Sequence, residues 1–557
     1  MKQIWWKNTV GYQIYPRSFQ DSNNDGIGDL QGVIQRLDYL KDLGIDFIWM
    51  SPFYKSPLDD NGYDISDYQD ILEDFGTLED FDQLLKEIHK RNMKLLIDLV
   101  LNHTSDEHPW FIESRSSKSN PKRDWYIWRD GKNGTEPNNW ESIFGGSAWE
   151  YDEKTDQYFL HVFSRRQPDL NWENKEVRKA LFNMVNWWID KGVDGFRIDA
   201  ISHIKKRPGL PDMPNPEGKR YVSSFDMHMN QQGIQEFLQQ FKDETYGKHD
   251  HILTVGEANG VSVHDAHHWV GKNGKMDMLF QFEHIDLWDY ESDQGMDIIG
   301  VKQALTRWQK GLEKDGWNAL YIENHDKPRI ISSWGNEKEY WRESATSLAT
   351  MYFLMKGTPF IYQGQEIGMT NGYYDSIQEY DDVAAINFYN EKKAEGMSNE
   401  EILFILGKTS RDNSRTPMQW SNEKNAGFST SKPWIKINKN YVDINVENQL
   451  NDENSILNYY KKLIQIKKKH QIFLDGSYDL LLENDKQIFA YKRSLDGQTA
   501  LIITNLSNEN ALWTSEDGNT VSREELLLSN YHVEPHEGTE SINLKPFEAR
   551  VYIINKT

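Results

Sequence analysis

The chain has 557 residues, which is enough for a large core with further domains attached to it. Its 87 acidic residues exceed the 63 basic ones, and the formal net charge of −24 argues against nucleic acid or an anionic membrane as a partner. The sequence contains no cysteine, which excludes a disulfide framework and thiolate chemistry. Because no apolar leader or membrane-spanning run is present, we expect a cytoplasmic protein, and an exported protein that has lost its signal is the alternative. We also expect a monomer that acts on a small-molecule partner.

Short apolar segments alternate with amphipathic ones from the amino terminus onward. The apolar segments indicate eight β-strands, at 11–16, 47–52, 94–103, 195–200, 252–258, 278–284, 319–326 and 359–366. Apolar residues at i, i+3 and i+4 indicate helices between them, for example at 30–44, 78–92 and 174–192. This alternation predicts an α/β fold with a parallel sheet. A count of eight favours a closed (β/α)8 TIM barrel over an open doubly wound sheet.

A loop rich in hard oxygen ligands, DSNNDGIGD (21–29), follows the first predicted strand. Gly26 permits a turn in it, although Gly32 stands where an EF-hand carries its twelfth-position Glu. We predict a structural Ca²⁺ (or Mg²⁺) site here, and an Asx-rich turn without an ion is the alternative. The ligands would be Asp21, Asn23, Asp25, Asp29 and the carbonyl of Ile27.

Two connections are far longer than the usual few residues. Residues 104–170 follow the third strand and are expected to form a small inserted domain over the barrel, and residues 367–420 follow the eighth strand. From about residue 480 the strands alternate apolar and polar residues, which predicts an antiparallel β domain. We therefore expect three parts: the barrel at 1–103 and 171–479, the inserted subdomain at 104–170, and a C-terminal β-sandwich at 480–557.

Polar side chains gather at the carboxyl ends of the predicted strands, where TIM barrels carry their functional groups. These side chains are His103, Asp199, Glu257, His325, Asp326 and Gln363. In GVDGFRIDA (192–200), period-2 spacing places Arg197 and Asp199 on one face of the strand and Phe196 and Ile198 on the other. Arg197 is expected to lower the pKa of Asp199, and a purely structural Asp–Arg pair is the alternative for this strand taken alone.

Three carboxylates on three strands suit the hydrolysis of a glycosidic bond. One carboxyl group protonates the leaving oxygen, a second attacks the sugar or activates water, and a third can stabilise the cationic transition state. The two histidines, His103 and His325, are suited to hydrogen-bond sugar hydroxyls. Metal binding is the competing interpretation, but no H-x-H or H-x-x-x-H pair occurs at these strands.

Four motifs in order resemble those of the α-amylase superfamily of glycoside hydrolases: DLVLNH (98–103), GFRIDA (195–200), GEA (256–258) and NHD (324–326). QPDLN (167–171) is similar to the additional motif of the oligo-1,6-glucosidase and α-glucosidase branch. The resemblance implies that Asp199 is the nucleophile, Glu257 the general acid and then base, and Asp326 the transition-state stabiliser. It also implies a retaining mechanism, which requires a raised pKa for Glu257.

The same resemblance implies which side chains line the pocket for a terminal glucose unit. They are Asp60, Tyr63, His103, Arg197, His325 and Arg411, together with Phe144, Phe163 and Gln167, where the inserted domain would meet the barrel. An Asp60–Arg411 pair would close the end of this pocket. A closed pocket suits an exo-acting enzyme that takes one glucose unit at a time from short substrates.

Ala200, directly after the implied nucleophile, bears on the linkage that is cleaved. Oligo-1,6-glucosidases of this branch typically carry Val there, and α-1,4-acting relatives carry Ala or Thr. Because Ala leaves room beside the leaving sugar and Asn259 could hydrogen-bond it, we predict a retaining exo-α-glucosidase that prefers α-1,4 substrates such as maltose.

Several alternatives share the three carboxylates. They are an oligo-1,6-glucosidase, a sucrose isomerase or glucosyl-transfer enzyme, and a trehalose-6-phosphate hydrolase that would use Lys205, Lys206 and Arg207 for the phosphate. The region after the seventh strand has no clustered arginine beyond Arg329, which speaks against the isomerase. A non-catalytic sugar-binding relative is disfavoured because all three carboxylates are present.

Overall fold

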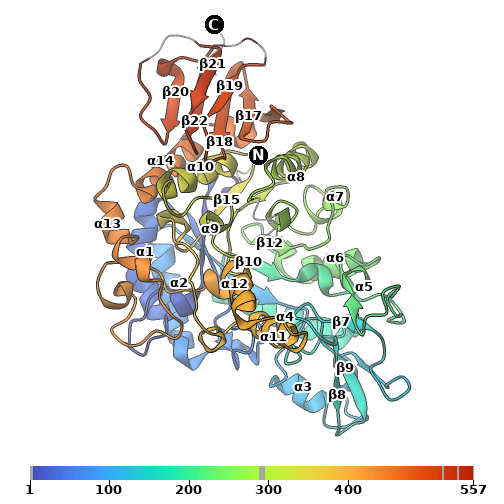
Figure 1. The fold of residues 1–557 in the computed structure, drawn as a ribbon. Helices are drawn as coiled ribbons and strands as arrows, with labels where there is room; N and C mark the ends of the chain where they lie inside the picture. The colour runs from blue at the N-terminus through green and yellow to red at the C-terminus, as the bar shows by residue number, and fades with distance from the viewer. Residues whose placement is uncertain (1–3, 288–294, 517, 519, 536–538, 556–557) are drawn as a thin grey trace.

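The computed structural model describes the chain except residues 1–3, 288–294, 517, 519, 536–538 and 556–557. Eight parallel strands form its central sheet (Figure 1), in the order β13-β12-β10-β5-β2-β1-β15-β14. A parallel bridge between Leu279 and Asn318 joins the two edge strands and closes the sheet. The strands are β1 (Gly11–Ile14), β2 (Phe47–Met50), β5 (Lys94–Val100), β10 (Gly195–Asp199), β12 (Leu253–Glu257), β13 (Met278–Phe280), β14 (Ala319–Leu320) and β15 (Thr358–Tyr362). The predicted TIM barrel is confirmed. Asp199 and Glu257 are the last residues of β10 and β12, whereas β5 and β14 are shorter than predicted and end before His103 and Asp326.

Helices surround the barrel, and local sequence signals fix their ends. Asp29 caps α1 by accepting a hydrogen bond from Gly32 N, and Thr77 and Asp80 form a capping box on α2. Gly192 ends α4 in the left-handed conformation that glycine adopts at little cost. The helices are α1 (Leu30–Leu43), α2 (Leu78–Lys90), α4 (Lys175–Lys191), α5 (Phe225–His228), α6 (Ile234–Glu244), α7 (Ala266–Trp269), α8 (Ile298–Gly311), α9 (Ile330–Ser333), α10 (Trp341–Phe353), α13 (Val446–Leu450), α14 (Ile456–Lys469) and α15 (Ile472–Asp475).

The two faces of β10 have different surroundings, as the alternation in the sequence predicts. Phe196 and Ile198 belong to the large apolar core that includes residues of the surrounding helices. Arg197 is buried on the other face, with its guanidinium 5.0 Å from the ring centroid of Trp49. Trp49 belongs to a separate aromatic cluster contributed by several barrel strands. The charged face of β10 therefore lies against the barrel interior.

The inserted region after β5 contains the short helix α3 (Pro109–Ser114) and a three-stranded antiparallel sheet of β6 (Trp128–Arg129), β9 (Gln157–Leu160) and β8 (Trp149–Asp152). A further strand, β7 (Trp140–Glu141), pairs with β11 (Val222–Ser223), which lies in the connection after β10. Trp140 Nε1 also donates to the carbonyl of Pro211. The Pro- and Gly-rich connection after β10 therefore packs on the inserted domain, an association that local sequence patterns do not reveal.

The long connection after β15 contains a helical hairpin that the sequence analysis did not predict, α11 (Val383–Ala394) and α12 (Asn399–Thr409). Its signals are present, because Asp382 caps α11 and Ser398 and Glu401 form a capping box on α12. The hairpin and its neighbours have a small apolar cluster of their own. The hairpin lies beside the mouth of the barrel, close to the inserted domain (Figure 1).

The C-terminal strands form the predicted antiparallel domain. Its two sheets share one apolar cluster. Elsewhere in the chain, after β2, the strands β3 (Tyr54–Lys55) and β4 (Asp67–Ile71) pair with each other as a separate antiparallel hairpin. The C-terminal sheets consist of β16 (Ser477–Leu481), β17 (Ile488–Leu495), β18 (Gln498–Asn505), β22 (Ala549–Asn555) and β20 (Leu526–Ser529), and of β19 (Ala511–Thr514) with β21 (Ser541–Leu544). Lys302 of α8 joins this domain to the barrel by donating to the carbonyls of Leu482, Asp485 and Ile488. None of the helices in the described part of the chain is suited to cross a membrane.

Candidate active site

A cavity of about 710 Å³ opens where the barrel strands end. Eleven of the residues predicted from the sequence line it: Asp60, Tyr63, His103, Phe144, Phe163, Asp199, Ala200, Glu257, Asn259, Asp326 and Arg411. The other three, Gln167, Arg197 and His325, lie behind this lining and contact it. The fold therefore brings together residues that are up to about 350 positions apart in the chain, as the strand ends of a barrel do.

One guanidinium, that of Arg197, contacts three carboxylates. Its Nη1 lies 2.6 Å from Asp199 Oδ1 and 2.9 Å from Asp98 Oδ1, and its Nη2 lies 3.0 Å from Glu257 Oε2. Asp98 is on the neighbouring strand, directly opposite Arg197 in the β10–β5 pairing. Arg197 thus fixes the positions of Asp199 and Glu257 relative to each other.

The electrostatics of this group differ from the prediction. Burial and the neighbouring Glu257 raise the pKa of Asp199, and the opposing effect of Arg197 does not compensate for them. Burial also raises the pKa of Asp98 to about 6. The physical reason is that three buried carboxylates share one cation. Asp199 therefore retains a proton more readily than an exposed aspartate does.

Ala200 connects the two carboxylates through its backbone. Its N–H donates to Glu257 Oε2 at 2.9 Å, directly after Asp199 in the chain. Its φ of 44° and ψ of 30° place it in the left-handed region, which is unfavourable for side chains that branch at Cβ. The backbone turn at Ala200 therefore helps to position the acid as well as the nucleophile.

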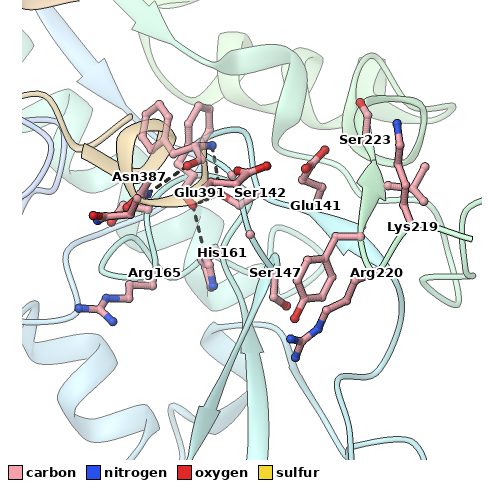
Figure 2. A pocket seen from close by; sticks show the side chains of 18 of the residues that line it. Glu141, Ser142, Ser147, His161, Arg165, Lys219, Arg220, Ser223, Asn387 and Glu391 are labelled. Carbon is pink, nitrogen blue, oxygen red and sulfur yellow. Dashed lines mark hydrogen bonds between the residues drawn. The ribbon is translucent and has the colours of Figure 1, made fainter. Parts of the chain in front are cut away.

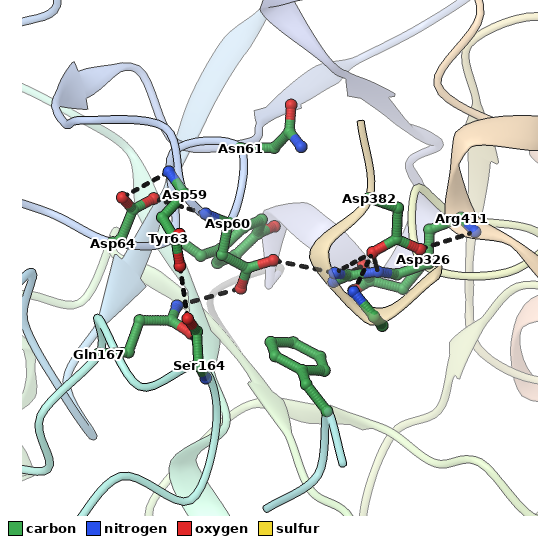
Figure 3. Close-up of polar contacts among 12 residues, drawn as sticks. Asp59, Asp60, Asn61, Tyr63, Asp64, Ser164, Gln167, Asp326, Asp382 and Arg411 are labelled. Atoms are coloured by element: carbon green, nitrogen blue, oxygen red, sulfur yellow. Dashed lines mark hydrogen bonds and ion pairs between the residues drawn. The ribbon is translucent and has the colours of Figure 1, made fainter. Parts of the chain in front are cut away.

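Asp60 and Arg411 both line the cavity and form an ion pair (Figure 3), in which Arg411 Nη2 is 3.0 Å from Asp60 Oδ1. The same Nη2 is 2.6 Å from Asp382 Oδ1, and Nη1 is 3.4 Å from Asp326 Oδ1. Gln167 Nε2 donates to the other oxygen of Asp60 at 3.0 Å. We call Asp60, Asp326, Asp382 and Arg411 the closed-end network. Each of its buried charges has an opposite charge beside it.

Asp326 is held in its ionised form. Burial would raise its pKa, but His325, Arg411 and Arg415 together bring it well below its usual range. Arg415 Nη2 lies 2.9 Å from Asp326 Oδ1, and His325 Nε2 lies 3.1 Å from Asp326 Oδ2. Gln13 Nε2 is 2.7 Å from His325 Nδ1, which leaves the imidazole proton on Nε2, facing Asp326.

The two predicted histidines are neutral at physiological pH. Burial lowers the pKa of His103 to about 4 and that of His325 to about 3. The Tyr63 ring stacks on His325, with centroids 5.2 Å apart, and its hydroxyl donates to Asp98. Phe163 lies 5.0 Å from the His103 ring. The histidines are thus hydrogen-bonding groups held between aromatic rings.

The site also contains polar residues that were not singled out from the sequence, among them Gln13, Asp98, Asp382 and Arg415. Asp98 lies within the DLVLNH motif and Arg415 within RDNSR, so motif position could have indicated both. Asp382 has no sequence signal beyond its place as a helix cap. Gln363, one of the predicted strand-end residues, accepts from Tyr15 N and lies outside the described cavity lining.

A second hollow, of about 1390 Å³, lies on the other side of Phe144 and Phe163, which line both spaces. Figure 2 shows Glu141 and Ser142 from the inserted domain together with Asn387 and Glu391 from α11. Asn387 Nδ2 donates to the backbone carbonyl of Phe144 at 3.0 Å. The Arg411 guanidinium lies 4.7 Å from the Phe144 ring centroid. Helix α11 therefore supports the aromatic wall of the active-site cavity from outside.

In the predicted cation loop (21–29), the carboxylates accept hydrogen bonds from nearby backbone N–H groups. Asp21 accepts from the N–H groups of Asn23, Asn24 and Gly26, Asp25 accepts from that of Ile27, and Asp29 caps α1. Within the described residues, no group of three or more His, Cys, Asp or Glu converges on a point that could hold a metal. The oxygen donors suit a hard cation, but they serve the loop amides in this conformation, so the Ca²⁺ or Mg²⁺ site stays a prediction.

Comparisons with known proteins agree with this geometry. The family model described as the α-amylase catalytic domain matches residues 13–476. The Bacillus subtilis (strain 168) protein named "Probable oligo-1,6-glucosidase 3" is 58% identical over 99% of this chain and 100% of its own length. Two solved structures each superpose on 99% of this chain and 100% of their own. They are trehalose-6-phosphate hydrolase from Bacillus licheniformis (TM-score 0.91, 43% identity) and isomaltulose synthase from Klebsiella sp. LX3 (TM-score 0.93, 41% identity).

Proposed function

Because the chain belongs to the α-amylase family of glycoside hydrolases, we propose that it is a retaining, exo-acting α-glucosidase that releases glucose from the non-reducing ends of short α-glucosides. The observation that supports this most strongly is the meeting of Asp199, Glu257 and Asp326 in one cavity beside the Asp60–Arg411 pair. A cavity that ends in a buried ion pair has room for the end of a sugar chain but not for its continuation.

In the proposed mechanism Asp199 attacks the anomeric carbon while Glu257 gives its proton to the leaving oxygen, so that the glycosidic bond breaks and a glucosyl ester forms on Asp199. Water then attacks that carbon from the same side as the departed sugar. Glu257 takes a proton from the water, and Asp199 leaves as a carboxylate, which gives overall retention. In this mechanism Glu257 carries a proton at the start, and Arg197 stabilises the ionised Asp199.

The remaining groups would bind the terminal glucose. Ionised Asp326 and neutral His325 suit hydroxyls next to the reacting carbon, and Asp326 also favours the developing positive charge. His103, Arg411 and Asp60 would hydrogen-bond the hydroxyls at the far side of the ring. The rings of Tyr63, Phe144 and Phe163 would exclude water from it.

Two observations bear on the linkage and favour different bonds. The relative with 58% identity is named an oligo-1,6-glucosidase, and the α-1,4 preference predicted from Ala200 has no support among the relatives described above. We therefore propose α-1,6-linked substrates of the isomaltose type as the preferred ones. Cleavage of α-1,4 bonds is the second candidate, and the small side chain of Ala200 in the cavity lining favours it.

Two other activities have weaker support. Likeness to isomaltulose synthase favours an isomerising or glucosyl-transfer enzyme, which would use the same three carboxylates. A trehalose-6-phosphate hydrolase needs cations for the phosphate, but Lys205 pairs with Glu173 and Lys206 with Asp169. Arg207 is absent from the described cavity lining. A non-catalytic sugar-binding role conflicts with the complete set of carboxylates.

The deciding experiment is a product profile from isomaltose, maltose, sucrose and trehalose, with the first-formed anomer followed by NMR. We expect glucose as the product, released first as the α-anomer, and a higher kcat/KM on isomaltose than on maltose. Release of β-glucose would refute the retaining mechanism. Conversion of sucrose into an isomeric disaccharide would favour the isomerase, and a preference for maltose would restore the α-1,4 prediction.

A further inference from the structure

We assign the leaving-sugar side of the cavity to the loops after β12, β13 and β14, of which the β13 loop lies across the barrel from the loop that carries Asp60. Asn259 follows β12, Glu283 and Asp286 follow β13, and Lys327 follows Asp326. In the barrel order, β13 stands four positions from β2, whose loop carries Asp60. We call Glu283, Asp286 and Lys327 the leaving-group rim.

Acidic side chains outnumber basic ones in the cavity lining. Among the lining residues that the structure describes, six are acidic and two are basic, Lys327 and Arg411. Arg411 is already shared by the carboxylates of the closed-end network. The six carboxyl groups are those of Asp60, Asp199, Glu257, Glu283, Asp286 and Asp326.

The second cation, Lys327, is held by the rim itself. Its Nζ lies 2.7 Å from Asp286 Oδ1, and the two side chains are 34% and 58% exposed. Glu283 is paired with Arg307 of α8 at 2.7 Å and accepts a hydrogen bond from Trp308 Nε1. Lys327 is therefore partly open to solvent, points its charge at a rim carboxylate, and lies next in the chain to Asp326. Removal of the Asp286 charge would leave its ammonium group available to an anion.

We propose that Asp286 makes the leaving-group side selective for uncharged sugars, and that Lys327 is an anion-binding group which Asp286 keeps engaged. This rests on the proposed glucosidase function. A phosphate or carboxylate on the leaving group would meet the surplus of negative charge, and it would have to compete with Asp286 for Lys327. The trehalose-6-phosphate hydrolase that shares this fold is named for a phosphorylated substrate, the kind of charged sugar that this rim would disfavour.

The test compares two substrates that differ in the charge of the leaving group, 4-nitrophenyl α-glucoside and 3-carboxy-4-nitrophenyl α-glucoside. The measured quantity is the ratio of kcat/KM on the anionic substrate to kcat/KM on the neutral one, at low and at high salt. Intrinsic differences in leaving-group reactivity cancel when this ratio is compared between variants. We expect Asp286→Asn to raise the ratio about tenfold at low salt, and less at high salt because the interaction is partly exposed.

Two further variants assign the effect. Lys327→Met in the Asp286→Asn background should return the ratio to near the wild-type value. Glu509→Gln, an exposed position in the C-terminal domain, makes the same change in net charge far from the cavity and should leave the ratio unchanged.

An Asp286→Asn ratio within twofold of wild type would overturn the proposal. A raised ratio that survives loss of the Lys327 charge would overturn the role of Lys327. If the wild-type enzyme hydrolysed neither aryl glucoside, nor isomaltose or maltose, the proposed function itself would fail, and this outcome is distinct from activity without charge selection.

Discussion

The two sides of the active-site cavity are built differently. In the closed-end network Asp60, Asp382 and Arg411 are buried, and one arginine contacts three carboxylates. On the leaving-group rim, Lys327 and Asp286 form a single pair that is partly exposed. Removal of one partner from a buried network leaves an uncompensated charge, whereas an exposed pair contributes little to stability.

This difference separates recognition of the glucose unit from the choice of what is attached to it. The closed end cannot change one residue without disturbing several others. The rim can change one residue at a time. Solved structures of this fold that are named for different activities still superpose on this chain with TM-scores of 0.91 and 0.93. Proteins with different named activities therefore share this fold.

The largest effect is expected between the two sides, at the reacting bond. Asp199→Asn and Glu257→Gln should each lower kcat by several orders of magnitude, since these groups act as a unit. 4-Nitrophenyl α-glucoside can mask loss of the acid, so isomaltose and maltose must be measured as well. Circular dichroism should show an intact fold. Near-normal turnover of the disaccharides by either variant would refute the proposed roles.

The next largest effect is expected in the closed-end network, compared with the leaving-group rim. Arg411→Ala removes the cation of the closed-end network, and we expect kcat/KM on isomaltose to fall by about 10²- to 10³-fold. Asp286→Ala on the rim serves as the comparison and should cost less than about tenfold on the same substrate.

The closed end also predicts how the wild-type enzyme treats polymers. Soluble starch should be hydrolysed far more slowly than maltose or maltotriose, because an internal segment of a chain cannot pass the Asp60–Arg411 pair. Chromatography of the products distinguishes the outcomes. Rapid appearance of internal fragments from starch would show that the cavity is an open cleft.

A smaller change is expected at Ala200, at the boundary between the two sides. Ala200→Val should shift the kcat/KM ratio toward isomaltose by about 10- to 200-fold at most. Because Ala200 has a positive φ of 44°, the branched side chain should also lower Tm, whereas Ala200→Gly should not. Ala200→Thr is the matched control, with the same branching and a polar atom. A shift toward maltose in Ala200→Val would contradict the steric explanation.

The pH dependence of kcat/KM tests whether Asp98, which also contacts Arg197, influences the pKa of Asp199. Activity should fall at low pH as Asp199 takes up a proton, which neutralises the nucleophile. The charge of Asp98 helps to raise the pKa of Asp199, so Asp98→Asn should lower that pKa and move the acidic limb to lower pH, by up to about one unit. A limb that stays in place would show that Asp98 does not influence the pair.

The smallest effect concerns a region away from both sides. If the 21–29 loop binds Ca²⁺ or Mg²⁺, EDTA should lower Tm by a few degrees, and added cation should restore it by mass action. In Asp21→Ala the melting temperature should no longer respond to either treatment. An unchanged Tm of the wild-type protein in EDTA would refute the cation site, and catalysis at low temperature should be unaffected in every case.

The parts of the structure that follow from local pattern were predictable. Period-2 spacing in β10 placed Arg197 and Asp199 on one face, and strand-end positions gathered the three carboxylates. The features that were not predicted concern residues whose neighbours in the structure are distant in the sequence. Burial and the neighbouring Glu257 raise the pKa of Asp199, and Asp98 on the adjacent strand, which also contacts Arg197, raises it further. Likewise Asp382 and the β7–β11 pairing join segments that have no common local signal.

The hydrogen bond from Asn387 to the Phe144 carbonyl has a consequence for the order in which the enzyme becomes competent during folding. The barrel alone supplies Asp199, Glu257 and Asp326, but the aromatic wall depends on α11, whose hairpin has its own small apolar cluster. A molecule with a folded barrel and an undocked hairpin would contain all three catalytic carboxylates but would lack the supported aromatic wall that encloses the sugar. Hydrogen exchange in residues 383–409 would report how often the native protein visits that state.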